Sequence, residues 1–126
     1  MSQNPAPGYA KKPDHVVAVT PFDGRVVVAL GGETIADSSD ALAVAESGYN
    51  AVYYLPMRDV RMDLAERIDT STYCPFKGKA TYYTFTVGER RAEGAAWVYE
   101  APYDEAMAIK DHLAFYTQRV DSVSVE

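Results

Sequence analysis

Two alternating segments joined by a two-residue turn constrain the fold most strongly. In residues 80–87, ATYYTFTV, aromatic and aliphatic side chains alternate with threonines, which is the period of a β-strand. Gly88 and Glu89 suit a type II′ hairpin turn, in which glycine takes the first position. The return segment, residues 90–99, places Trp97 among small residues that leave room for its indole ring. The sequence therefore predicts an antiparallel hairpin over residues 80–99.

The rest of the chain also contains short strand-like runs separated by glycine and proline. Each run is rich in β-branched or aromatic residues, which favours a strand over a helix. The first three are expected to form a meander, with a turn at residues 22–24. The predicted strands cover residues 15–20, 25–30, 33–37, 51–56, 59–64, 67–73, 113–116 and 120–125.

Two segments have helical character. Residues 38–48 begin with serines that can cap a helix and end at Gly48, which can terminate one. Residues 101–113 carry Pro102 and two acidic residues in a first turn, where they suit the helix dipole. We therefore predict a mainly β fold, one antiparallel sheet or two packed sheets, with two short covering helices.

The 126 residues fit one domain. Three prolines, a glycine and two lysines in residues 1–13 predict a flexible N-terminal tail, so the single β-rich domain is expected over residues 14–126. The polar start lacks the apolar region of a signal peptide. No apolar run reaches the roughly 18–20 residues of a membrane span. We expect a cytoplasmic protein that has no membrane partner.

Charge and cysteine content exclude several classes of function. The chain carries 18 acidic and 12 basic residues, a net charge of −6. Phosphate backbones require clustered lysine and arginine, so nucleic acid is not expected as a partner. The single cysteine, Cys74, cannot form an internal disulfide. With only His15 and His112 beside it, the chain lacks the ligand spacing of a zinc site, and we predict no metal and no cofactor.

The segment TYCPFKGKATYYTF, residues 72–85, raises the question of a reactive cysteine. The thiolate is the reactive form, and Lys77 and Lys79 are close enough in sequence to stabilise it. A catalytic cysteine normally needs a histidine base, and neither histidine lies near Cys74 in sequence. The favoured interpretation is a small buried Cys74 beneath a bend that proline and glycine shape.

Five segments over about residues 15–125 share the form and order of a known family. They are GGETIADSSDALAVAES, VYYLPMRDVRMDL, TYCPFKGKATYYTFTVG, AAWVYEAP and AIKDHLAFYTQRVDSV, and CPFKG and AAWVY are the most specific marks. Together they resemble successive blocks of a small bacterial family, domain-of-unknown-function family four-two-seven. The resemblance implies a β-tent-like fold, in which two sheets lean together. The chain lacks the paired cysteines of zinc-bearing β-tent relatives, so the resemblance implies no metal here.

The same family carries a nucleotidyltransferase label. Nucleotidyl transfer needs two or three carboxylates that hold Mg²⁺ against a triphosphate. Here Gly31 and Gly32 are followed by Asp37 and Asp40, whose D-x-x-D spacing differs from the usual D-x-D. Nucleotidyl transfer is therefore implied by the label alone and not by these residues.

Aromatic and basic side chains occur together in two of these segments, VYYLPMRDVRMDL and TYCPFKGKATYYTFTVG. They predict a pocket for a small anionic or nucleotide-like ligand, with Arg58 and Lys77 converging on its anionic group. One alternative is an enzyme that uses Cys74 or Asp59. Another is a structural or partner-binding module without a chemical site, for example a homodimer. The candidate residues, which the resemblance also marks, are Tyr54, Arg58, Asp59, Cys74, Lys77, Tyr82, Trp97 and Tyr99.

Overall fold

The computed structural model describes residues 4–126 and shows two antiparallel sheets, which confirms the mainly β class. The strands within these residues are β1 (Val17–Pro21), β2 (Val26–Leu30), β3 (Glu33–Ser38), β4 (Leu42–Glu46), β5 (Val52–Pro56), β6 (Ala65–Cys74), β7 (Gly78–Val87), β8 (Arg90–Tyr99), β9 (His112–Phe115) and β10 (Ser122–Val125). The helical elements are α1 (Gly8–Lys11) and the 3-10 helices η1 (Met57–Asp59), η2 (Met62–Leu64) and η3 (Asp104–Ile109).

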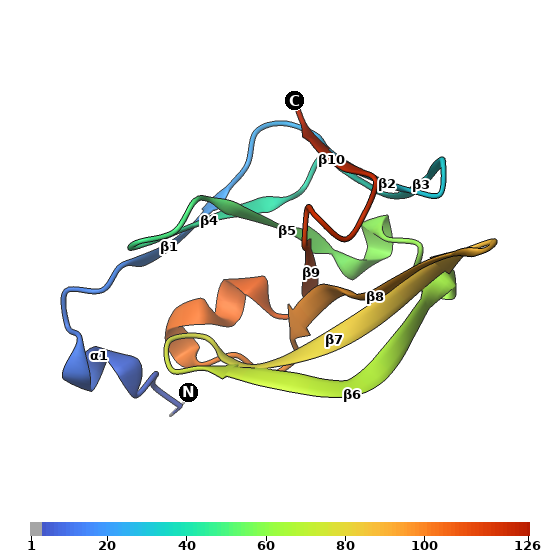
Figure 1. Cartoon of the computed structure of the whole chain (residues 1–126). Helices are drawn as coiled ribbons and strands as arrows, with labels where there is room; N and C mark the ends of the chain where they lie inside the picture. Colours follow the sequence, from blue (N-terminus) through green and yellow to red (C-terminus); the bar gives the residue numbers. More distant parts are fainter. Residues whose placement is uncertain (1–3) are drawn as a thin grey trace.

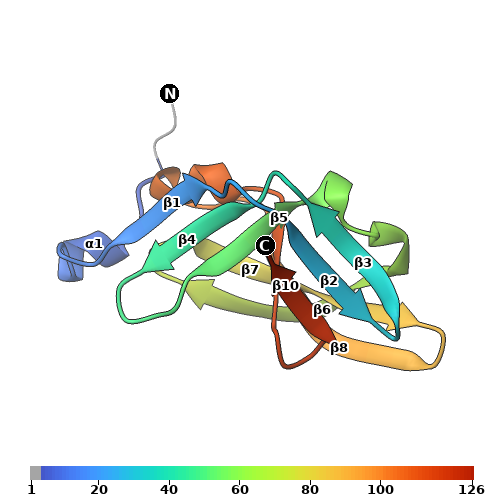
Figure 2. The same ribbon diagram turned by 90° about the horizontal axis from the view of Figure 1, so that it is seen from above.

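Seven strands form one sheet in the order β1-β4-β5-β9-β8-β7-β6, and β10-β2-β3 form the second. The large sheet folds back on itself, and β9 lies at the fold (Figure 1). We call β1, β4 and β5 the upper wing, and β6, β7 and β8 the lower wing. Figure 2 shows β10, β2 and β3 lying over β7 and β8 when the molecule is seen from above. The lower wing is therefore covered by the upper wing at one end and by the small sheet at the other.

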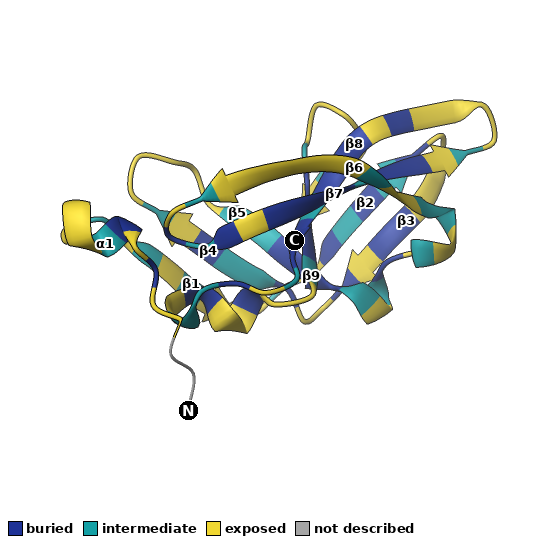
Figure 3. Cartoon of the chain, turned by 90° about the horizontal axis from the view of Figure 1, so that it is seen from below, coloured by how far each residue is buried: buried dark blue, intermediate teal, exposed yellow. Residues whose placement is uncertain are grey.

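The alternation along β8 explains why both of its faces are buried. Ala96 and Val98 belong to the core between the two sheets, together with Phe85. Tyr99 lies on the opposite face and packs with Tyr54 in a second cluster. Successive side chains of a strand point to opposite faces, so one face of β8 packs in the core while the other faces the upper wing. Figure 3 shows buried bands along β7 and β8, whereas the edge strand β6 is largely exposed.

The first two strands do not pair, so the predicted meander is wrong. β1 pairs with β4, and β2 pairs with β3 and β10. Between them, the backbone N–H of Phe22 donates to the carbonyl of Ala41 at 2.9 Å. The Phe22 ring packs against Tyr53 at 4.9 Å between ring centroids. These contacts hold the chain where it passes from the large sheet to the small one.

Residues 38–48 contain β4, a strand, where the sequence predicted a helix. An isolated helix of two turns is marginal in water, whereas β4 gains backbone hydrogen bonds on both sides, with β1 and with β5. The strand period puts Leu42, Val44 and Glu46 on one face. As part of a strand, Glu46 points its side chain to the same side of the sheet as Val44.

Two further segments differ from their predicted form. The stretch over residues 59–64, predicted as extended, falls largely on η1 and η2, and Val60 makes an isolated bridge to Ala36. The second predicted helix is present as η3, but it is shorter than residues 101–113 because β9 begins at His112. In residues 4–126, no helix has the length and apolar character needed to cross a membrane.

The N-terminal segment lies against the domain from residue 4 onward, while residues 1–3 of the predicted tail are outside the described residues. The backbone N–H of Asn4 donates to the carboxylate of Asp104 at 3.0 Å, and that of Ala6 donates to Glu105 at 2.8 Å. Ala6 is buried. These bonds attach the segment to η3.

A bulge in the β7–β8 ladder depends on one buried hydroxyl. The register shifts between Tyr83 and Phe85, opposite Gly94, whose φ of +57° favours glycine. The backbone N–H of Gly94 donates to Oγ1 of Thr84 at 3.1 Å, and both groups are buried.

We expect Thr84→Val, which keeps the side-chain volume, to leave this N–H without its acceptor. The free energy of unfolding should fall by about 1–3 kcal/mol, measured by urea denaturation. Thr86→Val, at an exposed position of the same strand, is the matched control and should change stability by less than about 0.5 kcal/mol. Equal losses in the two variants would contradict the role of the hydroxyl.

Candidate functional site

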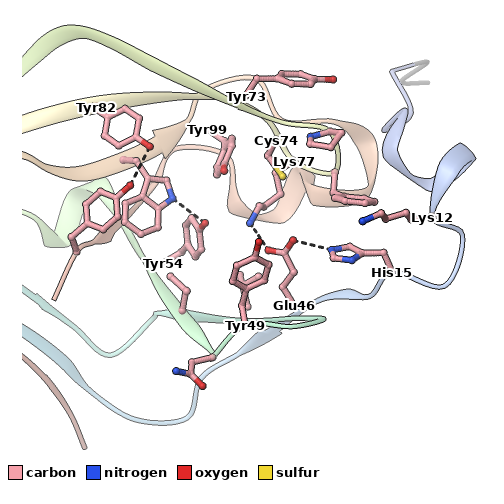
Figure 4. A pocket seen from close by; sticks show the side chains of 17 residues that line it. Lys12, His15, Glu46, Tyr49, Tyr54, Tyr73, Cys74, Lys77, Tyr82 and Tyr99 are labelled. Carbon is pink, nitrogen blue, oxygen red and sulfur yellow. Dashed lines mark hydrogen bonds and ion pairs between the residues drawn. The ribbon is translucent and has the colours of Figure 1, made fainter. Parts of the chain in front are cut away.

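A cavity of about 550 Å³ lies between the upper and lower wings. Strands from both wings, the β6–β7 turn and the N-terminal segment contribute to its wall (Figure 4). Its lining residues are Lys12, His15, Val44, Glu46, Tyr49, Asn50, Val52, Tyr54, Tyr73, Cys74, Pro75, Phe76, Lys77, Tyr82, Trp97, Tyr99 and Tyr116. One side of the cavity is aromatic and the other is charged.

Hydrogen bonds hold the aromatic side in place. Trp97 donates its indole N–H to the hydroxyl of Tyr54 at 3.1 Å, with the two rings nearly perpendicular. Tyr82 lies across from Trp97 in the β7–β8 ladder, and its hydroxyl is 3.3 Å from that of Tyr116. Tyr99 follows on β8, on the same face as Trp97. The rings also pack on one another, with centroids 4.6 Å apart for Trp97 and Tyr116 and 6.4 Å apart for Tyr54 and Tyr99.

Three ionisable side chains form the charged side. Nζ of Lys77 donates to Oε1 of Glu46 at 2.8 Å, and Nε2 of His15 lies 2.9 Å from Oε2 of the same carboxylate. The side chains of Lys77, Glu46 and His15 are only 12%, 13% and 14% exposed. Figure 4 shows Lys77 and Glu46 meeting between the rings and His15. One carboxylate therefore uses both oxygens to bind two separate parts of the chain.

The pKa directions show that Lys77 and Glu46 are both ionised near neutral pH. Burial acts to raise the pKa of Glu46, but the hydrogen bonds from Lys77 and His15 outweigh it and bring the pKa below its usual value. Burial acts to lower the pKa of Lys77, but interactions with Tyr54 and Glu46 reverse this effect and raise it. Burial, with the hydrogen bond to Tyr82, raises the pKa of Tyr116 to about 12, so its phenol stays neutral.

The N-terminal segment and Phe76 fix the position of His15. The imidazole stacks on the Phe76 ring with centroids 3.9 Å apart, and Tyr9 packs edge-on against that ring at 5.0 Å. The backbone N–H of Gly8 donates to the carbonyl of Pro75 at 3.0 Å. A Cβ at Gly8 would lie 2.6 Å from the Phe76 ring, so glycine permits this close approach.

Cys74 lines the same cavity and is half-buried at the end of β6. The fold brings His15 into this cavity as well, although the two residues are far apart in sequence. Within residues 4–126, no hydrogen bond joins the thiol to His15, so the nucleophile–base contact of a catalytic cysteine is not formed in this structure.

The structure brings six of the eight predicted residues together and separates the other two. The six that line the cavity are Tyr54, Cys74, Lys77, Tyr82, Trp97 and Tyr99. Arg58 and Asp59 lie on η1 at another cavity, of about 340 Å³. There, Arg58 pairs with Asp40 at 2.7 Å, and Asp59 accepts a hydrogen bond from Ser38 at 2.7 Å. The expected convergence of Arg58 and Lys77 is wrong, because the chain leaves β5 at Pro56 and turns into η1.

No local pattern in the sequence marks His15, Glu46 or Tyr116 as part of the cavity. The helix predicted over residues 38–48 would not place Glu46 in the cavity. The alternation of Leu42, Val44 and Glu46, by contrast, indicates a strand. His15 meets Glu46 across 31 positions of the chain, and no local pattern predicts that contact.

These features define a small mainly β domain with an aromatic cavity and a buried ion pair. The chain belongs to the family described as a domain of unknown function, DUF427, whose model matches residues 18–126, and the resemblance is thereby confirmed. No curated protein matches the chain. The matched region includes Glu46 and Lys77 but begins after His15, so the N-terminal wall of the cavity precedes it.

The acidic residues do not fit the family's nucleotidyltransferase label, NTP_transf_9. The carboxylate of Asp37 is paired with Arg25 at 2.6 Å, and that of Asp40 with Arg58. Across residues 4–126, no three side chains of histidine, cysteine, aspartate or glutamate cluster in a way that could hold a metal ion. Asp37 and Asp40, the carboxylates that follow the glycine pair, are thus each engaged by an arginine side chain.

We expect Glu46→Gln to destabilise the fold by roughly 3 kcal/mol, because it leaves the largely buried ammonium of Lys77 without its partner. Adding Lys77→Met removes that uncompensated charge, so the double variant should be more stable than Glu46→Gln alone. Urea denaturation of the single and double variants measures this coupling. Simple addition of the two single losses would show that the pair is not coupled.

The pKa of Glu46 also predicts a pH dependence. Its pKa in the fold lies below the reference value of 4.5, so the stability that its ionised form contributes is present above about pH 4.5 and is lost as pH falls through the folded pKa. The stability difference between the wild type and Glu46→Gln should therefore shrink at acid pH. Urea denaturation of both proteins at a series of pH values measures this stability difference. Glu89→Gln, in the exposed β7–β8 turn, is the matched control, and a difference that stays constant with pH would contradict the pairing.

Proposed function

We propose that the cavity binds a small anionic or nucleotide-like ligand, with a planar ring among the tyrosines and Trp97 and an acceptor group on Lys77. The observation that carries this proposal is an ammonium held by Glu46 inside a ring-lined cavity. Lys77 has three N–H donors and donates one to Glu46. The other two are available to oxygen atoms of a ligand.

Stability alone gives little reason to place an ion pair here. Taking two charges out of water costs several kcal/mol per ion, and well-packed hydrophobic side chains often stabilise a fold equally well. Nζ of Lys77 lies 5.8 Å from the centre of the Tyr99 ring, where an apolar side chain would also pack. Charged groups kept in a concave, partly apolar site are typical of ligand recognition.

The size and lining of the cavity agree with a ring-bearing ligand. Its volume of about 550 Å³ falls within the range of roughly 300–1,000 Å³ typical of small-molecule sites. Stacking of a planar base on an aromatic side chain contributes about 1–3 kcal/mol. Lys12, Tyr49 and Tyr73 are exposed members of the lining, and Lys12 offers a second cation to an anionic group.

Thermal-shift screening followed by calorimetry tests this proposal, with nucleosides, nucleotides, aromatic carboxylates and sugar phosphates as probes. We expect ring-bearing probes to bind. Lys77→Met should weaken their affinity at least about tenfold, because a charged hydrogen bond is lost.

Lys79→Met is the matched control, since it removes the same charge at an exposed position two residues along the chain, outside the cavity. Its affinity should equal that of the wild type. Equal loss in both variants, or binding of sugar phosphates as tight as that of nucleotides, would contradict the assigned roles of Lys77 and the rings.

A further inference from the structure

Lys77 and Glu46 present a hydrogen-bond donor beside an acceptor. Their bonded atoms are 2.8 Å apart, and both side chains line the cavity. The ammonium keeps two unused N–H groups, and each carboxylate oxygen keeps a second lone pair after accepting from Lys77 or His15. The complementary partner is an acceptor beside a donor, which is the arrangement of C=O and N–H in a cyclic amide.

We propose that the cavity recognises the lactam edge of a planar heterocycle. The ring carbonyl accepts from Lys77, the adjacent ring N–H donates to Glu46, and the ring packs against the aromatic side of the cavity. This inference rests on the proposed function and names the group of the ligand that enters. Uracil-like and hypoxanthine-like rings carry such an edge, whereas adenine-like rings have no ring carbonyl.

The charge balance of the site favours a neutral edge at this position. Lys77 and Glu46 are both ionised, so their charges cancel. An anionic group placed beside Glu46 would lose its hydration and also meet a like charge. A lactam satisfies the donor and the acceptor together and leaves neither unpaired. A phosphate carried on the same ligand would instead suit the exposed Lys12.

The hydrogen bond to His15 fixes the orientation of the Glu46 carboxylate, which is the acceptor for the ligand. It occupies Oε2 of Glu46 at 2.9 Å while Lys77 occupies Oε1, so the carboxylate is held at both ends. The stacking of His15 on Phe76 resists rotation of the imidazole. A preorganised carboxylate loses little conformational entropy when a ligand binds.

The test compares ligands that differ by one methyl group, so it needs no change to the protein. Affinities of the full chain for uridine and 3-methyluridine, and for inosine and 1-methylinosine, are measured by calorimetry or by chemical-shift titration. Benzoate serves as a ring-bearing anion without an N–H donor. We expect uridine or inosine to bind, and N-methylation to weaken binding at least about tenfold, because it removes the donor and covers the carboxylate.

Glu46→Gln should reduce this methylation penalty, while Glu89→Gln in the exposed turn should leave it unchanged. Equal affinity for the methylated and unmethylated nucleosides overturns the proposal that Lys77 and Glu46 recognise a lactam edge. Binding of benzoate without binding of either nucleoside also overturns it, yet leaves the proposed ring-binding function in place. If neither the nucleosides nor benzoate bind, and the nucleotides of the thermal-shift screen do not bind either, the proposed function fails and this inference fails with it.

Discussion

The carboxylate of Glu46 connects three parts of the chain that are distant in sequence. It ends β4 in the upper wing, accepts from Lys77 on the β6–β7 turn of the lower wing, and bonds to His15 in the N-terminal segment. Each contact spans 31 positions. Because the three side chains are largely buried, their interaction is screened much less than a surface ion pair would be. This carboxylate therefore links the two wings at a second place besides β9, and it forms the centre of the charged side of the cavity.

The two faces of strand β8 have different surroundings. Ala96 and Val98 pack in the core between the sheets, where Val98 is fully buried. Trp97 and Tyr99 leave the opposite face of the same strand and line the cavity. Changes on the cavity side can therefore alter its lining without disturbing the packing between the sheets, provided that the strand keeps its register. The buried hydroxyl of Thr84, at the bulge opposite Gly94, helps to hold that register.

Local patterns in the sequence predicted strands better than they predicted partners. The hairpin over residues 80–99 follows from alternation and its Gly-Glu turn, and it forms β7 and β8. The pairing of β1 with β4 depends on contacts across the chain, which no turn signal specifies. The aromatic residues of the site were predictable because they lie on strands with clear periodicity. His15 and Glu46 could not be predicted as cavity residues, because their contact is tertiary. Arg58 was predicted to lie in the same pocket as Lys77, but residues 57–59 form a 3-10 helix that carries it elsewhere.

In the proposed complex the ligand meets the same Lys77–Glu46 contact that links the two wings, so binding would be coupled to the stability of the fold. A ligand that bonds to Lys77 and Glu46 together excludes water from the pair, and a lower local dielectric strengthens the attraction between them. A ligand that competes for Glu46 would instead separate Lys77 from its partner and weaken the link between the wings. The proposed ligand, with an acceptor for Lys77 beside a donor for Glu46, is therefore also the kind of ligand that would preserve the contact between the wings.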